Sequence, residues 1–484
     1  MSDKNSKYLL ASILIFLIFV SIFWSYSIDD AFVTFRYAEN FANGHGLTFN
    51  PGEKPVEGYS NFLWLLILCL AYLAGFPIYL AAKILGVICF LLAGIVWYRN
   101  LSGREPVLIQ LTPMFFLANP YTAFWAVSGL ELGLYALILT LLAARILKKS
   151  YWSLLLIPLL VLIRPEGFVI GMAIVAASWL MGLLEKDIRW KFHLIMLGMI
   201  IISFSLLIVF RIAVFGHPMP NTFYAKSTLA IHGFLRLVKI MVYYFPLAIL
   251  FMLGLFRIIR RFRETGRYLF YAIIFLAMAA INCLADAVMN FHARYLIAFI
   301  PFFLITAFYG LDHLKNRKLI AVGLILSGMS ILIPTWPVYG SVSQEKKIWG
   351  AQKSLIEFIN KQPEQIRISL TDVGRIPFYT KARYNDIWGL VSADIAHDAF
   401  NPVREYLRFP DYFVFVGYFW GDNIRLHFGK ERLIAQCKGF YQTYQYIGSG
   451  IPENGNLNED GYYYLIFRKN QSAVDSLLKL YPIN

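Results

Sequence analysis

Long, nearly uninterrupted runs of apolar residues fill the first 338 positions of the chain. A helix needs about 20 residues to cross the hydrocarbon core of a bilayer. Twelve stretches reach or approach that length: 9–26, 61–75, 78–98, 106–127, 131–147, 151–163, 167–184, 194–214, 237–256, 268–288, 294–311 and 319–338. This pattern predicts a polytopic α-helical membrane domain over residues 1–338.

The pattern changes from residue 339 onward. Residues 366–371 alternate apolar and polar side chains, a period of two that is typical of a half-buried strand. The segments 412–417 (YFVFVG) and 462–467 (YYYLIF) predict buried strands, and 346–360 has a helical pattern. We therefore expect a small C-terminal α/β domain over residues 339–484.

The basic residues predict the topology, because Lys and Arg collect in cytoplasmic loops. Five arginines between residues 257 and 267 place that connection in the cytoplasm. When the spans are counted outward from it as alternating crossings, the other basic loops also fall on the cytoplasmic side. The stretch 61–75 must then begin and end outside, as a re-entrant or interfacial segment. This leaves about 11 transmembrane helices and an extracytoplasmic C-terminal domain. The alternative is a true span over 61–75. It would place the basic segment 99–104 on the outer side, against the positive-inside rule.

Composition agrees with a membrane protein, since 58% of the residues are hydrophobic and 15% are charged. The formal net charge of +15 would suggest nucleic acid in a soluble protein. Here the cytoplasmic loops account for it, so no nucleic-acid partner is expected. The four cysteines do not indicate a disulfide framework. No P-loop or GxGxxG motif occurs, which argues against a nucleotide-driven reaction.

The first outer loop, 27–60, contains an acidic pair and a predicted surface helix. Phe32, Phe35 and Ala38 recur at helical spacing, and Arg36 lies on the opposite, polar face. Asp29 and Asp30 stand at the start of this helix. Such carboxylates can accept a proton or bind a divalent metal, or they can serve as ordinary helix N-caps.

Further polar side chains are predicted to gather on the same outer face. Carboxylates there could act as base, metal ligands or acceptors from sugar hydroxyls. Arginine and lysine could clamp a lipid phosphate. The candidate contacts to substrate or phosphate are Arg36, Glu57, Tyr59, Asn61, Glu131, Arg164, Glu166, His217, Asn221, Tyr224, Lys226, Arg294 and Asp372. His217 is isolated in sequence, so a structural role is favoured over a metal role. No metal signature occurs elsewhere, and a metal site would have to come from Asp29 or Asp30.

Seven short motifs follow one another between residue 29 and about residue 390. They are DDAFVTFRYAENFANGHGLTFNPGE, VEGYSNFLW, SGLE, RPEG, PNTFYAK, TDVGRIPFYT and DIWGL. In this order they resemble the GT-C glycosyltransferases that use polyprenyl-phosphate sugars, most closely the group of the mycobacterial terminal arabinofuranosyltransferases. The resemblance implies a multi-pass enzyme of a bacterial inner membrane with a periplasmic or external active site. It also implies an aspartate of the first outer loop as general base, which by position is Asp29 or Asp30, with Asp29 slightly favoured.

The expected reaction is an inverting transfer of a sugar from a polyprenyl-phosphate donor. The acceptor would be a cell-envelope glycan, glycolipid or glycoprotein, and the sugar could be arabinofuranose. The leaving phosphate needs no general acid, so one carboxylate centre suffices. One alternative is a transporter or flippase of lipid-linked saccharides, for which charges near the bilayer midplane and internal repeats would be expected. Another is a non-catalytic carbohydrate-binding membrane protein.

Overall fold

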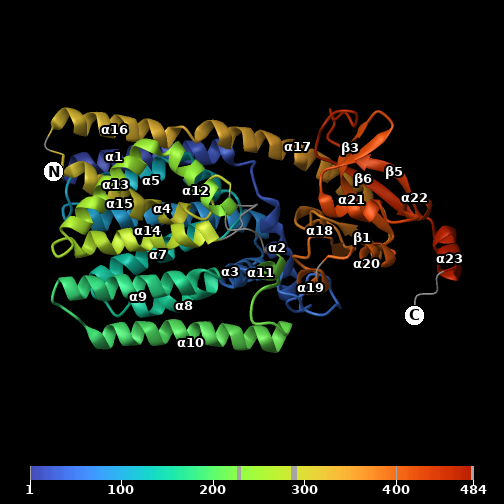
Figure 1. Ribbon diagram of the computed structural model, residues 1–484, viewed down its shortest axis with the longest axis horizontal. Coiled ribbons are helices and arrows are strands. Elements are labelled where there is room, and N and C mark those ends of the chain that lie inside the picture. The colour runs from blue at the N-terminus through green and yellow to red at the C-terminus, as the bar shows by residue number, and fades with distance from the viewer. Residues whose placement is uncertain (1, 226–230, 285–290, 315, 399, 481–484) are drawn as a thin grey trace.

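The structure, a computed structural model, describes residues 2–225, 231–284, 291–314, 316–398 and 400–480. Figure 1 shows a bundle of roughly parallel helices with a β-sheet domain at one end. The end of the bundle beside this domain is called the domain-side end, and the other is called the far end. The fold class is as predicted, a polytopic helical domain followed by a small α/β domain.

Most of the predicted hydrophobic stretches form helices near their predicted bounds. The bundle helices are α1 (Ser2–Phe23), α4 (Ile78–Leu101), α5 (Thr112–Ala118), α6 (Pro120–Ala126), α7 (Leu132–Leu147), α8 (Ser153–Ile163), α9 (Gly167–Leu184), α10 (Trp190–Phe215), α12 (Ile231–Tyr243), α13 (Phe245–Arg260), α14 (Gly266–Leu284), α15 (Ile300–Asp312) and α16 (Arg317–Leu332). Two short 3-10 turns, Ile109–Leu111 and Ile297–Phe299, precede α5 and α15.

Two predicted single helices are broken. The stretch 106–127 divides into α5 and α6 at Asn119-Pro120, because Pro120 has no N–H to continue α5 and the Asn119 side chain caps α6 by accepting from the Tyr121 N–H. The stretch 237–256 divides into α12 and α13, which meet at 103°. Six described helices could each cross a membrane by length and composition, or seven with this bent pair as one span. The number of about 11 spans therefore stays a prediction.

The basic loops gather at the far end of the bundle. The connection between α9 and α10 lies there in Figure 1, and its Asp187 pairs with Lys149 of the α7–α8 loop. Arg267, at the start of α14, pairs with Glu105 beyond the end of α4 at 2.6 Å. This common location is what the predicted alternation of spans requires.

The short helix α3 (Phe62–Leu73) lies beside α2 (Asp29–Ala42). Near its start, Asn61 accepts a hydrogen bond from Thr34 at 3.0 Å, and near its end the Tyr72 hydroxyl accepts from Asn43 at 3.4 Å. Twelve residues of helix span about 18 Å, less than the roughly 30 Å of a hydrocarbon core. Both ends of α3 therefore stay beside α2 at the domain-side end, as expected for a re-entrant or interfacial segment.

A long helix connects the bundle to the C-terminal domain. After α16 the chain continues as α17 (Thr335–Ile359), which runs along the top of Figure 1 into the sheet domain. The predicted domain boundary at 338/339 therefore falls inside α17.

The C-terminal domain is built on a mixed six-stranded sheet. The strands are β1 (Arg367–Leu370), β2 (Arg383–Asp386), β3 (Tyr412–Trp420), β4 (Asn423–Leu426), β5 (Tyr444–Gly450) and β6 (Tyr463–Lys469), in the order β2-β1-β3-β6-β5 with β4 paired to β3. The three predicted strands correspond to β1, β3 and β6, whereas β2, β4 and β5 were not predicted. The helices around the sheet are α18 (Arg375–Phe378), α19 (Ala393–His397), α20 (Pro402–Leu407), α21 (Gly429–Ala435), α22 (Phe440–Thr443) and α23 (Gln471–Leu480).

Helix α2 lies between the bundle and the C-terminal domain, where every residue from Ala31 to Ala38 is buried. The Phe32 and Phe35 rings contact Phe378 of α18 at centroid distances of 5.5 and 5.9 Å. The C-terminal domain also covers the face that carries Arg36. The predicted surface helix is therefore corrected to a helix enclosed on both sides.

Candidate active site

The first turn of α2 directs its two aspartates to different neighbours. Ile28, with extended backbone angles, is the N-cap and makes no side-chain cap bond. Neither Asp29 nor Asp30 therefore acts as the N-cap, and the capping alternative is excluded for both. Their charges still suit the positive end of the helix dipole.

Asp29 is bound by the C-terminal domain and α17. Its Oδ1 accepts from the backbone N–H of Arg375 at 3.0 Å and from Gln352 Nε2 at 3.1 Å. The Arg375 guanidinium donates to Gln352 and to Ser27, and it forms an ion pair with Glu345. Burial raises the pKa of the Asp29 carboxyl, and the nearby Arg375 opposes this rise. Asp29 thus joins the two domains.

Asp30 instead faces a cavity at the domain-side end. Its Oδ2 accepts from Arg294 Nη1 at 2.9 Å, and the two side chains are 23% and 8% exposed. The cavity holds about 70 Å³. Its polar lining comes from α2, the 58–61 segment, the start of α7, the end of α8, α11 (Asn221–Ala225) and the segment before α15. The lining residues include Asp30, Thr34, Tyr59, Asn61, Glu131, Arg164, Thr222, Arg294 and Tyr295.

Six predicted site residues therefore lie around one cavity, although they are up to 264 positions apart in sequence. A hydrogen-bonded chain links three of them: Asn61 Nδ2 donates to Glu131 Oε2 at 2.7 Å, and Glu131 pairs with Arg164. Arg164 also pairs with Glu166, which adds a seventh predicted residue behind the wall. The Arg164 guanidinium lies over the Tyr295 ring at 5.0 Å. Asp30, Glu131, Arg164 and Arg294 in this cavity thus each have an opposite charge beside them, which offsets the cost of their burial.

Two buried polar atoms at this cavity have no hydrogen-bond partner within the described residues: Tyr59 Oη and Arg294 Nε. Tyr59 is 2% exposed, and its ring packs against Tyr37, Phe62 and Phe215. A buried polar group without a partner costs about 1–3 kcal/mol. A ligand that hydrogen-bonds both atoms would remove that cost.

Other predicted contacts hold the walls of the site instead of lining the cavity. Glu57 forms a buried ion pair with Arg211 at 2.8 Å, and burial raises the pKa of Glu57 to about 7. Asn221 Nδ2 donates to the carbonyls of Gly389 and Leu390 in the C-terminal domain. His217 is not isolated, because its ring stacks on His397 at 3.9 Å and Tyr224 lies 4.2 Å from His397.

Arg36 and Asp372 also lie away from the cavity. Arg36 donates to the carbonyls of Phe49, Pro377, Thr380 and Ala382. These bonds occupy its guanidinium, so the predicted phosphate contact is corrected to a link between domains. Asp372 accepts from the hydroxyls of Tyr462 and Tyr464, and burial, together with repulsion from Asp29, raises its pKa to about 7. Lys226 lies outside the described residues.

Sequence reasoning missed Thr34, Thr222 and Tyr295 as lining residues, and Arg375 as the partner of Asp29. Tyr295 follows Arg294 and Thr222 follows Asn221 in the sequence, and both of those neighbours are predicted site residues. Adjacency to a predicted residue could therefore have indicated them. The signal for Thr34 was weaker: its hydroxyl lies one helical turn after Asp30 on α2.

The described residues contain no group of three or more His, Cys, Asp or Glu side chains placed to hold a metal ion. Asp29 already accepts from two donors, and Asp30 pairs with an arginine. These two aspartates do not form a donor set that fits a metal ion.

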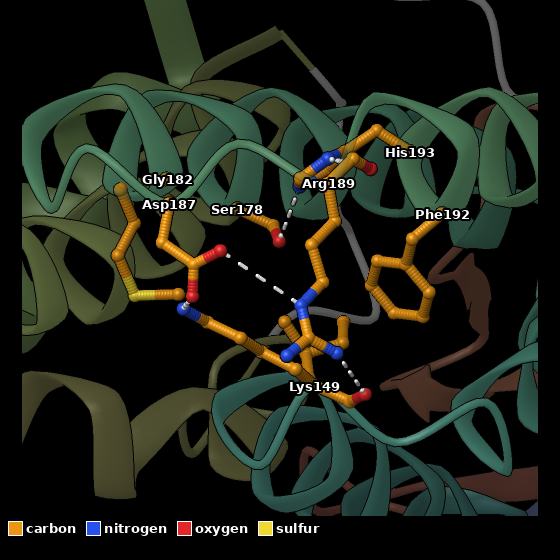
Figure 2. Close-up of a pocket in the computed structure, with 9 residues that line it drawn as sticks. Lys149, Ser178, Gly182, Asp187, Arg189, Phe192 and His193 are labelled. Atoms are coloured by element: carbon orange, nitrogen blue, oxygen red, sulfur yellow. Dashed lines mark hydrogen bonds and ion pairs between the residues drawn. The ribbon is translucent and has the colours of Figure 1, made fainter.

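A second, smaller hollow lies at the far end and is shown in Figure 2. It holds about 10 Å³ and is bordered by Lys149, Asp187, Arg189 and His193. Asp187 lies between Lys149 and Arg189, and His193 contacts Ser178 at 3.0 Å. This volume admits about one water molecule. The cluster therefore ties the α7–α8 and α9–α10 loops together.

The geometry can be compared with known proteins. Residues 344–467 match a family model described as a domain of unknown function, DUF8728. The terminal β-(1→2)-arabinofuranosyltransferase of Mycobacterium tuberculosis is 26% identical over 229 residues. That alignment covers 41% of this chain and 34% of the relative, so the chain matches about a third of the relative's length.

Solved structures match far more of the chain. ArnT from Cupriavidus metallidurans aligns with a TM-score of 0.62 in the apo state and 0.63 when bound to undecaprenyl phosphate. Each alignment has 14% identity and covers 98% of this chain and 99% of ArnT. The chain has the GT-C glycosyltransferase fold.

A second GT-C structure agrees. The archaeal oligosaccharyltransferase AglB from Archaeoglobus fulgidus, in complex with an inhibitory peptide and a dolichol-phosphate, aligns with a TM-score of 0.53 and 13% identity. This alignment covers 85% of the present chain and 69% of AglB. The GT-C fold thus includes both the bundle and the C-terminal domain, since the ArnT alignment leaves only 2% of the chain unmatched.

Proposed function

We propose that this chain is an inverting glycosyltransferase that moves a sugar from a polyprenyl-phosphate donor to a cell-envelope glycan, glycolipid or glycoprotein. The observation that carries the proposal is the domain-side cavity, where the Asp30 carboxylate pairs with the Arg294 guanidinium and Arg164 lines the same cavity. A base and a phosphate clamp are the two elements that this reaction needs.

The comparisons support the ligand class. ArnT was solved with undecaprenyl phosphate and AglB with a dolichol-phosphate, and both have the GT-C fold. The M. tuberculosis relative is named for arabinofuranosyl transfer, which makes arabinofuranose the first sugar to test. The gathering of basic loops at the far end supports a multi-pass location in the bacterial cytoplasmic membrane with the cavity on the periplasmic or external side.

In the proposed reaction, Asp30 takes the proton of the acceptor hydroxyl as its oxygen bonds to the anomeric carbon. The bond from that carbon to the phosphate oxygen breaks, and its electron pair remains on the departing polyprenyl phosphate. Asp30 is now preferred over Asp29 as the base, because Asp30 lines the cavity whereas Asp29 is bound to Arg375 and Gln352.

Arg294 and Arg164 stabilise the phosphate during this step, and Lys226 is a further candidate from the sequence. Asn61, Glu131 and Tyr59 orient hydroxyl groups of the sugar or the acceptor. Glu166 fixes Arg164. Glu57, Asn221, His217 and Tyr224 hold the cavity walls through their contacts with α10 and the C-terminal domain.

The test is sugar transfer by the purified chain in detergent, with a panel of defined polyprenyl-phosphate sugars that includes arabinofuranose. Detergent removes the two compartments between which a flippase would act, so product formation distinguishes the two functions. Wild-type protein is expected to form product, and Asp30→Asn to lose at least about 100-fold in rate while remaining folded. Wild-type turnover by Asp30→Asn would rule out this assignment.

A further inference from the structure

We propose that the donor phosphate replaces Asp30 on Arg294, so that binding of the donor releases the carboxylate that then accepts the proton. This inference rests on the proposed function and adds an order of events to it. Without the donor, Arg294 holds Asp30; with the donor, Arg294 holds the phosphate.

The resting contact is an ion pair between a buried arginine and a partly buried aspartate. Arg294 Nη1 lies 2.9 Å from Asp30 Oδ2, and the Arg294 side chain is 8% exposed. A carboxylate in such a pair is a poor base, because the neighbouring guanidinium stabilises its charged form. The pair therefore protects the site from activating water when no donor is present.

Arg294 is built to accept a second anion without moving away. A guanidinium carries five N–H donors in a planar fork, and Arg294 Nε is buried without a partner within the described residues. The group lies 5.9 Å from the Trp125 ring and 5.8 Å from the Tyr295 ring, which fix its position. A phosphate oxygen can satisfy Nε while a second oxygen competes with Asp30 for the rest of the fork.

Arg164 is less suited to this exchange. It contacts two carboxylates, those of Glu131 and Glu166, whereas the described ion pair of Arg294 is with Asp30. A phosphate that approached Arg164 would have to compete with both glutamates. The exchange is therefore expected at Arg294.

The exchange changes Asp30 in the direction that catalysis requires. Once the phosphate occupies Arg294, Asp30 has lost a neighbouring cation and gained a neighbouring anion. Both changes raise its affinity for a proton. Asp30 thus becomes an effective base in the presence of the donor, at the position from which the acceptor is deprotonated.

The experiment measures binding of undecaprenyl phosphate to the purified full-length chain in detergent. This lipid is the product of the proposed reaction and needs no knowledge of the sugar. If Asp30 competes for Arg294, Asp30→Asn should bind the lipid about tenfold more tightly than wild type, although it has lost transfer activity. Arg294→Gln should bind about tenfold more weakly, and Arg294→Lys serves as a second variant if Arg294→Gln does not fold.

The double variant Asp30→Asn/Arg294→Gln separates exchange from simple repulsion. If the gain from Asp30→Asn persists without Arg294, the carboxylate merely repels the phosphate and the exchange is refuted. The matched control is Asp29→Asn, which removes the same charge one residue away from a side chain bound to Arg375 and Gln352. This control should not bind more tightly than wild type.

Other outcomes are equally decisive. Unchanged or weaker binding by Asp30→Asn would overturn the exchange and leave the proposed function standing, since transfer is measured separately. No binding of the lipid by wild type, together with no transfer, would overturn both.

Discussion

Gly374 lies against Asp29 so closely that no side chain fits between them. A Cβ atom on residue 374 would lie 2.1 Å from the Asp29 carbonyl oxygen and 2.2 Å from its Oδ2. The φ angle of Gly374 is −92°, outside the left-handed region, and the close approach is what requires glycine. The C-terminal domain therefore reaches the first turn of α2 by direct backbone contact.

Gly374→Ala should consequently displace the aspartate pair. We expect a loss of about 1–3 kcal/mol in stability, the usual cost of overpacking, together with a large loss of transfer activity. Thermal unfolding in detergent and the transfer assay measure the two effects. Gly340→Ala in α17 is the control, because nothing lies within 4 Å of its Cβ position. An active, fully stable Gly374→Ala would show that the contact can relax.

The ion pair of Arg164 and Glu131 should matter far more for folding than that of Lys149 and Asp187. The first pair is buried, with side chains 7% and 3% exposed, whereas Asp187 is 49% exposed. Arg164→Gln leaves Glu131 buried without its cation and should cost about 3–5 kcal/mol. Lys149→Gln at the hollow of Figure 2 should change stability little, because solvent screens this pair. Equal costs in chemical unfolding would contradict the burial of the first pair.

Asp372 should make stability depend on pH. Burial raises its pKa from 3.8 to about 7, so the folded chain binds this proton more tightly than the unfolded chain. The stability that the folded chain gains from this proton is fully present below about pH 4 and is lost as the pH rises through 7. Asp372→Asn removes this titration. The melting temperature of the variant minus that of wild type should therefore be larger at pH 8 than at pH 5. A difference that is the same at both pH values would contradict the raised pKa.

The helical part of the fold was largely predictable, because length and apolar composition determine which segments can cross a membrane. The predicted bounds of α9, 167–184, are those of the structure. The bend between α12 and α13 was missed although Pro246 stands at the first turn of α13, where proline marks a helix start. Strand β5 was missed because it contains two glycines and is buried only at its first and last residues, so it gives no buried alternation.

The candidate site was predictable as a set of residue types but not as a geometry. Helical spacing placed Arg36 on the polar face of a predicted surface helix, where it was expected to contact substrate or phosphate. It meets backbone carbonyls from residues more than 340 positions away, which no local pattern records. The choice between Asp29 and Asp30 depends on Arg375 and Arg294 in the same way. Sequence spacing treats two adjacent carboxylates alike, whereas the fold separates them.

Tyr59 provides a test in which stability and function should change in opposite directions. Its hydroxyl is buried at the cavity and has no partner within the described residues. Tyr59→Phe should therefore keep or raise stability, by up to about 1 kcal/mol, because an unsatisfied polar group is removed. If the hydroxyl binds the substrate, kcat/KM for transfer should nevertheless fall about tenfold. The neighbouring Tyr37, whose ring lies 4.9 Å from Tyr59, is the matched control: its hydroxyl bonds Val56 and Gly58, so Tyr37→Phe should lose stability instead. A Tyr59→Phe variant that is less stable but equally active would show that this hydroxyl serves the fold and not the ligand.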